Sequence, residues 1–179
     1  MIPKPEDKSV VTSKWLYKIN HGADGSAEKY KAIFVARGFS QKEGIDYDDI
    51  FAPVARYTTI WSIIALAATQ GWSLHQMDVK TAFLRGSIKE EVYVEQPLGF
   101  EVQDRDIYVC KLKKALYGLK QPPRAWYERI DSYLMKLVFT RRDVDPNLYF
   151  KVDKEKPLIL ILYLDDLFLT GVDPSHSSV

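Results

Sequence analysis

The feature that most constrains the fold is a pair of apolar runs separated by only two acidic residues. Residues 158–164 and 167–170 are both strand-like, and only Asp165-Asp166 stands between them. Two strands joined by so short a connection fold back on each other as a hairpin, with both carboxylates at its tip. Mutual repulsion and partial burial would raise the proton affinity of these carboxylates unless a cation neutralised them. The pattern therefore points to a divalent cation at this tip.

A third carboxylate would complete such a site. Oxygen-only ligands favour magnesium or manganese over zinc, and a pair of these ions needs a further carboxylate from another strand. Asp78 stands near the end of a strand expected over 74–79, which we expect to pair beside the hairpin. The spacing alone leaves a second interpretation open, in which Asp165-Asp166 is a solvated turn and Asp78 caps a helix.

The remaining pattern favours mixed α+β structure in one compact unit, because the periodicity changes roughly every 15 to 25 residues. A strand pair is expected over 15–19 and 30–36, joined across 21–26 by a turn that contains Asp24-Gly25. Further strands are expected at 92–94, 108–112 and 148–152.

Two helices are expected. The first, capped by Thr58 or Thr59 and closed by Gly71, carries apolar residues at such density that we expect it to be mostly buried. The second starts at Pro123, a favourable first helical position, and is amphipathic through Val138.

Composition excludes several classes of protein. The 25 basic and 24 acidic residues leave a net charge of +1, so composition alone does not identify a nucleic-acid binder. Cys110 is the only cysteine, which excludes an internal disulfide and a cysteine-based zinc site. Residues 1–10 are polar and contain prolines, and the apolar runs are short, so neither a signal peptide nor a membrane span is expected.

Several stretches together resemble the reverse-transcriptase domain of copia-type retrotransposon polyproteins. Residues 163–171 (YLDDLFLTG) resemble the catalytic box of that family, and residues 76–84 (QMDVKTAFL) resemble the strand that carries its first catalytic aspartate. Other stretches match the family in the same order along the chain: 30–39, 41–47, 51–56, 91–97, 116–121 and 145–149. The match covers residues 12–171, far more than one short motif gives by accident.

The resemblance implies an α+β right-hand polymerase fold, of which this chain carries only the fingers and palm subdomains. The palm would be an antiparallel sheet backed by helices, and the family's thumb and ribonuclease H domains would be absent. Residues 1–179 would then form a partial reverse-transcriptase domain. The fingers hairpin and loop would occupy residues 12–56. Residues 57–171 would be mainly palm, together with the remaining fingers elements, and residues 172–179 would be a frayed tail.

The resemblance also implies a catalytic mechanism. Asp78 and Asp165 would hold two magnesium ions, for which manganese could substitute, and Asp166 would support the site. The backbone carbonyl of Val79 would add a metal ligand. Phe83 would stand where a bulky ring meets the sugar 2′ position and excludes ribonucleotides, so that the product is DNA; an ordinary core phenylalanine is the alternative.

Basic and loop residues would hold the substrates. Lys31 and Arg37 would grip the incoming triphosphate, although the family carries an arginine where Ile33 stands. The resemblance also implies a loop that runs under the nucleotide. In it Tyr117 and Gly118 would bind the nucleotide, and Lys120 and Arg124 would contact nucleic-acid phosphates.

The implied partners are an RNA or DNA template–primer, deoxynucleoside triphosphates, and the rest of a polyprotein with thumb, ribonuclease H, integrase and capsid regions. The implied location is a virus-like particle in the cytoplasm, or the nucleus, with no membrane partner. The alternative is a catalytically silent remnant with at most weak binding to nucleic acid or a partner.

Overall fold

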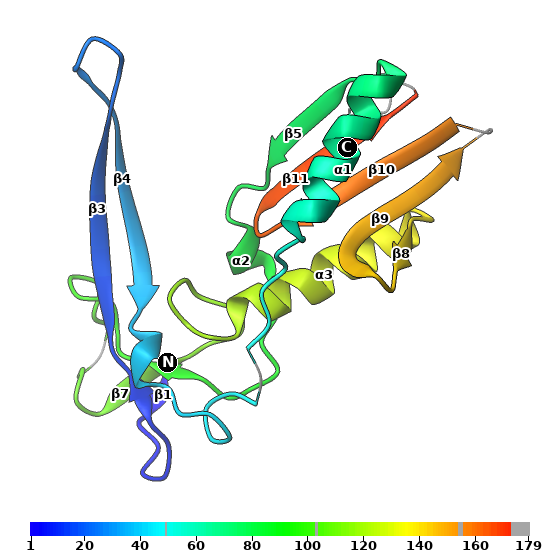
Figure 1. The fold of residues 1–179 in the computed structure, drawn as a ribbon. Coiled ribbons are helices and arrows are strands. Elements are labelled where there is room, and N and C mark those ends of the chain that lie inside the picture. The colour runs from blue at the N-terminus through cyan, green and yellow to red at the C-terminus, as the bar shows by residue number, and fades with distance from the viewer. Residues whose placement is uncertain (49, 103, 154–155, 173–179) are drawn as a thin grey trace. The chain divides into compact units, whose positions relative to one another are not determined.

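A computed structural model describes residues 1–48, 50–102, 104–153 and 156–172 (Figure 1). The chain divides into two compact units, each made of two separate stretches. Unit 1 comprises Met1–Ile50 and Gly86–Ala125, and unit 2 comprises Phe51–Arg85 and Trp126–Val179. The expectation of one compact unit was wrong, because each unit builds a hydrophobic cluster of its own. The tail expected over 172–179 lies outside the described residues apart from Val172.

Unit 1 contains a four-stranded sheet of order β1-β7-β6-β2, in which β2 and β6 are parallel and the other neighbours antiparallel. Its strands are β1 (Ile2–Pro3), β2 (Val10–Val11), β6 (Tyr93–Val94) and β7 (Tyr108–Lys111). Buried Val11, Val94 and Leu119 form its core with Ala36 and Val92. The strands expected at 92–94 and 108–112 are confirmed, whereas β1 and β2, only two residues long, carry too little pattern to be predicted.

A long hairpin also belongs to unit 1. Its strands β3 (Ser13–His21) and β4 (Ala27–Ala36) confirm the expected pair and extend it. The register places Lys18 opposite Lys31, and strand alternation puts both on one side of the ribbon with Lys14 and Lys29. We call these four exposed lysines the lysine face. The aromatic side chains take the other side, where the ring centroid of Trp15 lies 5.1 Å from that of Phe34.

Unit 2 is built on a five-stranded antiparallel sheet of order β5-β11-β10-β9-β8. Its strands are β5 (Leu74–Asp78), β8 (Thr140–Arg142), β9 (Asp145–Asp153), β10 (Lys156–Tyr163) and β11 (Asp166–Gly171). The strands expected at 74–79 and 148–152 and the hairpin after residue 158 are confirmed. The two turn residues are Leu164 and Asp165 and not Asp165-Asp166 as expected, because Tyr163 pairs with Asp166, which is the first residue of β11. The edge strand β8 was missed because its three residues are polar and exposed.

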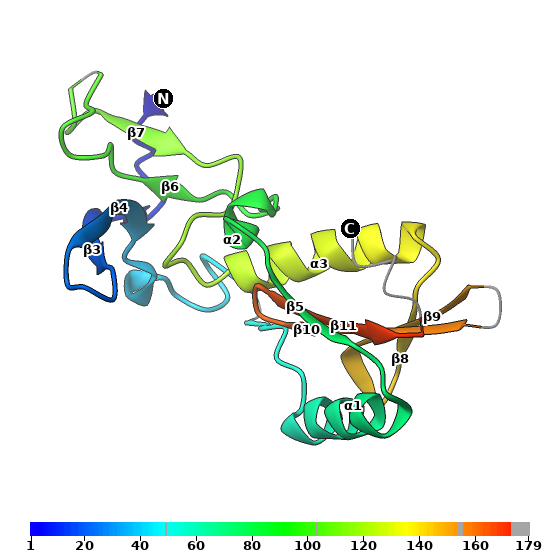
Figure 2. The same cartoon turned by 90° about the horizontal axis from the view of Figure 1, so that it is seen from above.

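Three helices complete the described secondary structure of unit 2. The first turn of the third helix, residues 122–125, belongs to unit 1. The three helices are α1 (Tyr57–Gln70), α2 (Ala82–Arg85) and α3 (Pro122–Lys136), and α1 and α3 lie on opposite faces of the sheet (Figure 2). The α3 face carries the core, in which Trp126, Ile130 and Leu134 pack with alternate residues of β10 and β11 such as Leu162. The expected amphipathic helix is thus confirmed, although it ends before Val138, which has a positive φ of 65°.

A buried tyrosine ties α3 to the sheet. Tyr149 on β9 is fully buried and donates a hydrogen bond of 2.9 Å from its hydroxyl to the Asp131 carboxylate on α3. Arg141 on β8 donates to the same carboxylate at 3.2 Å. Burial raises the pKa of Tyr149 far above its ordinary value, which keeps the phenol protonated and able to donate this hydrogen bond.

Helix α1 differs from the expectation in two ways. It is not mostly buried: Ala67 is its only buried residue, and Trp61 is 67% exposed, because apolar side chains surround the helix while only one stripe of it faces the sheet. Nor do Thr58 or Thr59 cap it, since the N-cap residue is Arg56 and makes no side-chain cap bond. The expected end is confirmed, with Gly71 in the left-handed conformation at φ 66°.

The cap of α1 comes from β9 instead. The buried Asp145 carboxylate accepts a hydrogen bond from the Arg56 N–H at 3.1 Å and another from the Thr59 hydroxyl at 2.7 Å. Its other oxygen accepts from the Asn147 N–H at 3.0 Å. A negative charge at a helix N-terminus is also favoured by the helix dipole.

We expect Asp145→Ala to lower the free energy of unfolding by about 2–4 kcal/mol, because it removes a cap and leaves buried donors without an acceptor. Urea unfolding followed by circular dichroism measures this loss. Asp143→Ala, at an exposed neighbouring position, is the matched control and should change stability by less than about 0.5 kcal/mol. Equal effects of the two substitutions would contradict the capping role.

No helix in the described part of the chain is both long enough and apolar enough to cross a membrane.

Candidate active site

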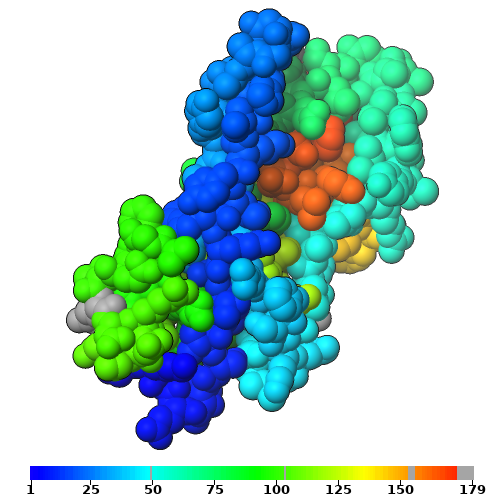
Figure 3. Space-filling view, turned by 90° about the vertical axis from the view of Figure 1, so that its left-hand side faces the viewer, coloured from blue at the N-terminus to red at the C-terminus, as the bar shows by residue number. Residues whose placement is uncertain are grey.

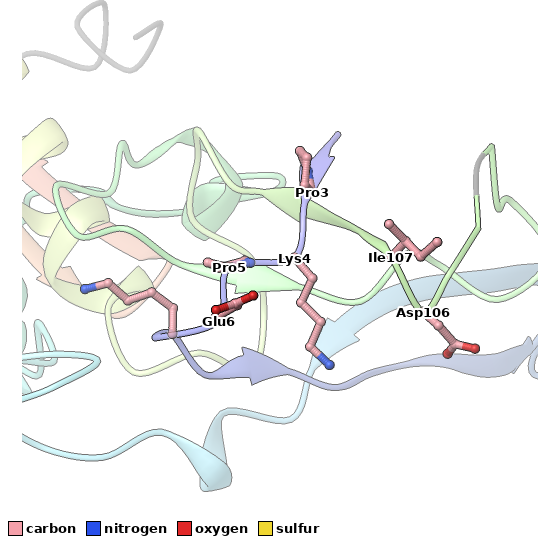
Figure 4. Close-up of a pocket in the computed structure, with 7 residues that line it drawn as sticks. Pro3, Lys4, Pro5, Glu6, Asp106 and Ile107 are labelled. Carbon is pink, nitrogen blue, oxygen red and sulfur yellow. The ribbon is translucent and has the colours of Figure 1, made fainter.

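Strand pairing in unit 2 brings the sequence-predicted carboxylates onto neighbouring backbone positions. Asp166 is the Cα partner of Asp78 across β11 and β5, and also of Tyr163 across the β10–β11 hairpin. Asp165 lies in the turn next to Asp166, and the Gln76 amide donates to Asp166 Oδ1 at 3.3 Å. By strand alternation Asp78 and Asp166 lie on the sheet face opposite to the α3 core. In Figure 3 the orange end of this hairpin is part of the visible surface.

Three separate segments hold the hairpin turn. The Leu164 N–H donates to the Pro53 carbonyl at 2.7 Å, and the Leu164 carbonyl accepts from Trp126 Nε1 at 2.9 Å. The Asp165 carbonyl accepts from the Val79 N–H at 3.0 Å. The peptide groups around Asp165 are therefore bonded to the segment before α1, to α3 and to the segment after β5.

Backbone strain flanks the carboxylates on both sides. Leu164 has φ 56° and Thr81, three residues after Asp78, has φ 57°. Such left-handed backbone is unusual for a side chain larger than that of asparagine, and costs about 1–3 kcal/mol that the surrounding contacts must offset. Strain of this kind clusters at functional sites, which marks the turn and the segment after β5 as candidates.

The chemistry of this donor set fits a hard divalent cation, because it offers carboxylate and backbone carbonyl oxygens and neither thiolate nor imidazole. The backbone positions of Asp78, Asp165 and Asp166 are adjacent, as that chemistry requires. Among the described residues, however, no three carboxylate, imidazole or thiolate side chains converge into one group that could hold an ion. The structure therefore supports the placement of the donors and not a formed cage.

The segment after β5 carries the other two candidates of unit 2. The Val79 carbonyl accepts a hydrogen bond from the Ala82 N–H at 3.1 Å, which leaves one of its two lone pairs for another ligand. Phe83 lies on α2, is half-buried and packs against the core of unit 2. Its packing agrees with the alternative of a core phenylalanine.

Lys31 and Arg37 belong to unit 1. Lys31 lies on β4 within the lysine face, and Arg37 follows the last residue of that strand and precedes the short 3-10 helix η1 (Gly38–Ser40). Both side chains are exposed. Lysines placed directly opposite each other, as Lys18 and Lys31 are, repel, so an anionic ligand on the lysine face would relieve an unfavourable pair.

The loop that contains Tyr117 and Gly118 is joined backbone to backbone with the end of β4. The Tyr117 carbonyl accepts from the Ala36 N–H at 2.8 Å, and the Gly118 carbonyl accepts from the Gly38 N–H at 3.1 Å. Gly118 has φ 90°, and a Cβ on it would lie 2.0 Å from the Ala36 carbonyl oxygen. Only glycine allows this approach.

A buried amide pair fixes the end of the same loop. The Gln41 side chain donates to Gln121 Oε1 at 3.2 Å and accepts from the Lys120 N–H at 3.0 Å. Gln121 in turn donates to the Asp46 carbonyl at 2.8 Å. Arg124 forms an ion pair with Glu90, so a phosphate contact by Arg124 would compete with that partner.

Sequence reasoning missed the residues that hold these candidates in place: Pro53, Trp126, Gln41 and Gln121. The amphipathic pattern identified Trp126 only as a core residue. The one available signal was that a buried indole N–H needs an acceptor, and that signal does not say which carbonyl supplies it.

Comparison with known proteins gives a consistent result. A family model described as "Reverse transcriptase (RNA-dependent DNA polymerase)" matches residues 1–177. The chain is 45% identical over 174 residues to a retrovirus-related Pol polyprotein from transposon TNT 1-94 of Nicotiana tabacum, covering 97% of this chain and 13% of that protein. It is 40% identical over 173 residues to the retrovirus-related Pol polyprotein from transposon RE1 of Arabidopsis thaliana, covering 97% of this chain and 12% of that protein.

A more distant relative is the Gag-Pol polyprotein of transposon Ty1-DR5 of Saccharomyces cerevisiae, 31% identical over 168 residues, covering 94% of this chain and 9% of that protein. The chain therefore spans about an eighth or less of the length of each of these three relatives. No solved structure matches it.

Proposed function

The chain belongs to the reverse transcriptase (RNA-dependent DNA polymerase) family, and we propose that it forms the fingers and palm of a copia-type polymerase that copies RNA into DNA. Unit 1 is then the fingers, including the remaining elements over 86–125, and unit 2 is the palm. The observation that carries the proposal is the pairing of Asp78 with Asp166 beside the turn of Asp165.

The family uses divalent metal ions, and we assign two magnesium ions, or manganese in their place, to Asp78, Asp165 and the Val79 carbonyl. When bound, such ions lower the pKa of a primer 3′-hydroxyl and neutralise charge on the triphosphate. The protein's own contribution is to hold the carboxylates in place: β5 fixes Asp78, and the clamped turn fixes Asp165. Asp166 supports the site, and the Gln76 amide restrains its carboxylate.

In unit 1, Lys31 and Arg37 are proposed to bind the triphosphate of the incoming nucleotide, since an exposed cationic ribbon offers donors to phosphate. Tyr117 and Gly118 would face the nucleotide, and Lys120 and Arg124 nucleic-acid phosphates. On this proposal Lys31→Gln raises the KM for deoxynucleotides several-fold in steady-state extension, and an unchanged KM would remove Lys31 from this role.

Primer extension on an RNA template with a DNA primer tests the function. We expect only weak, non-processive, magnesium-dependent addition of deoxynucleotides by the purified chain, and we expect it to be lost in Asp78→Asn. The alternative, a catalytically silent remnant, predicts no extension from folded protein. Extension that Asp78→Asn retains would argue that another protein in the preparation is responsible.

Phe83 is proposed to select deoxynucleotides by steric exclusion of the ribose 2′-hydroxyl. We expect Phe83→Val to raise the incorporation of ribonucleotides relative to deoxynucleotides by about 10- to 200-fold, the range expected for a change in pocket size. Competing single-nucleotide additions measure the ratio. Leu84→Ala on the same short helix is the control and should leave the ratio unchanged; a core role alone for Phe83 would lower both incorporation rates equally.

The chain would act as a segment of a longer polyprotein, alongside thumb, ribonuclease H, integrase and capsid regions, on template–primer substrates. We propose that this polyprotein resides in cytoplasmic virus-like particles. Sedimentation of host extracts, with the chain detected by antibody, tests this, and its absence from particle fractions would contradict it.

A further inference from the structure

The turn that contains the Leu164–Asp165 peptide has an unusual backbone conformation. Leu164 has a positive φ, whereas Asp165 is not among the described non-glycine residues with positive φ. A two-residue hairpin turn with positive φ at its first central position alone has the pattern of a type II′ turn, which favours glycine there. Leucine occupies that position here, so the turn does not follow from local sequence preference.

A second turn type could compete with type II′, and it differs from type II′ only in the orientation of the central Leu164–Asp165 peptide. Rotation of the central peptide by about 180° converts type II′ into type I′, in which the second central residue also has positive φ. Aspartate tolerates that conformation. Such a flip would reorient the Asp165 backbone, and with it the carboxylate.

One side chain opposes the flip. The Leu164 carbonyl is the oxygen of the central peptide, and it accepts the indole N–H of Trp126 at 2.9 Å. Trp126 is 3% exposed and lies within the core of unit 2, so its indole is held by packing. A flipped peptide would turn the carbonyl away and leave a buried indole N–H without this acceptor, which is costly.

We propose that Trp126 is a positioning residue for catalysis, whose indole N–H selects the II′ turn and thereby aims Asp165. The inference rests on the proposed function, because Asp165 acts only if the chain polymerises DNA. Pro53 and Val79 hold the two ends of the turn, and Trp126 holds its centre.

The test removes the hydrogen-bond donor of Trp126 and keeps an aromatic ring at this position. Trp126 is replaced by 3-benzothienylalanine, in which sulfur stands for the indole N–H, and in a second variant by phenylalanine. We expect kcat for single-nucleotide addition to fall by about 100-fold, as misplacement of a reacting group does, with KM for deoxynucleotide and template–primer within about three-fold. The same replacement at Trp61, which is 67% exposed on α1, is the control and should leave kcat unchanged.

A rescue separates positioning from packing. Glycine adopts the first position of a II′ turn without help, so Leu164→Gly in the Trp126→Phe background should recover at least ten-fold in kcat. A role of Trp126 in packing alone predicts no recovery. Loss of kcat in proportion to a loss of folded protein, without rescue, would overturn the proposal.

A readout without activity keeps this inference distinct from the proposed function. Residual dipolar couplings of the Leu164–Asp165 peptide report its orientation in the chain without metal or substrate. We expect a reoriented or averaged peptide in the benzothienylalanine variant. The same orientation as in the parent chain would refute the inference, even if the parent polymerises DNA; a reoriented peptide in a chain that never extends a primer would refute the proposed function alone.

Discussion

Asp165→Asn is expected to lower single-turnover primer extension by about 10³-fold, because removal of one metal-binding charge costs about 4 kcal/mol of transition-state stabilisation. The substitution keeps the size of the side chain, and the Asp165 carbonyl still accepts the Val79 N–H. The fold should therefore survive, which circular dichroism and the unfolding temperature check.

Two other carboxylates of unit 2 provide the comparison for Asp165→Asn. Asp166→Asn should cost less, because Asp166 is proposed to support the site and not to bind both ions. Asp143→Asn, an exposed position in the same unit, should retain full activity. A loss of less than ten-fold at Asp165, in folded protein whose activity depends on magnesium, would exclude this carboxylate as a metal ligand.

Gly118→Ala is expected to destabilise unit 1 by about 3–5 kcal/mol, the sum of backbone strain and overpacking. The new Cβ would meet the Ala36 carbonyl oxygen at 2.0 Å and its carbon at 3.1 Å. Ala36 cannot move freely, because its N–H donates to the Tyr117 carbonyl and its side chain is part of the core. The loop and the end of β4 would have to separate.

Gly44→Ala is the matched control for Gly118→Ala. Gly44 also has a positive φ, 76°, but no atom lies within 4 Å of a Cβ placed there. The Gly44→Ala substitution should lower the free energy of unfolding by only about 1–2 kcal/mol, the penalty of the left-handed conformation for alanine. Native-state hydrogen exchange of β4 and β7 amides, compared with β10 amides of unit 2, measures each loss within its own unit. Similar losses for both substitutions would show that the close approach to Ala36 is not limiting.

Local pattern was sufficient for the elements that carry the catalytic candidates. Two apolar runs with two residues between them favour a hairpin, and β10 and β11 do pair, with Leu164 and Asp165 as the turn residues. The position of β5 beside this hairpin was an expectation that the spacing left open, and the pairing of Asp78 with Asp166 agrees with it. Gly71 closes α1 and a turn after His21 closes the β3–β4 hairpin, because the required backbone conformations are encoded by single residues.

Contacts between distant segments were not predictable from such patterns. The cap of α1 was sought at Thr58 or Thr59 and comes from Asp145, 89 residues from Arg56. The exposure of Trp61 was missed because apolar density does not reveal how many neighbours a helix has. Arg124 was considered a phosphate ligand, and its ion pair with Glu90 is set by a segment 34 residues away.

The sequence by itself determined that Asp165 and Asp166 lie at the end of a hairpin, since periodicity and the length of a connection are local properties of the chain. That Asp78 joins them was an expectation that the spacing left open, and the pairing of β5 with β11 agrees with it. Only the tertiary structure decided how those carboxylates are held. Leu164 adopts a conformation that its own preferences disfavour, because Pro53 and Trp126 supply hydrogen bonds that no residue nearby in sequence can supply. The orientation of Asp165 is thus a property of packing, where many distant contacts together outweigh the conformational preference of one residue.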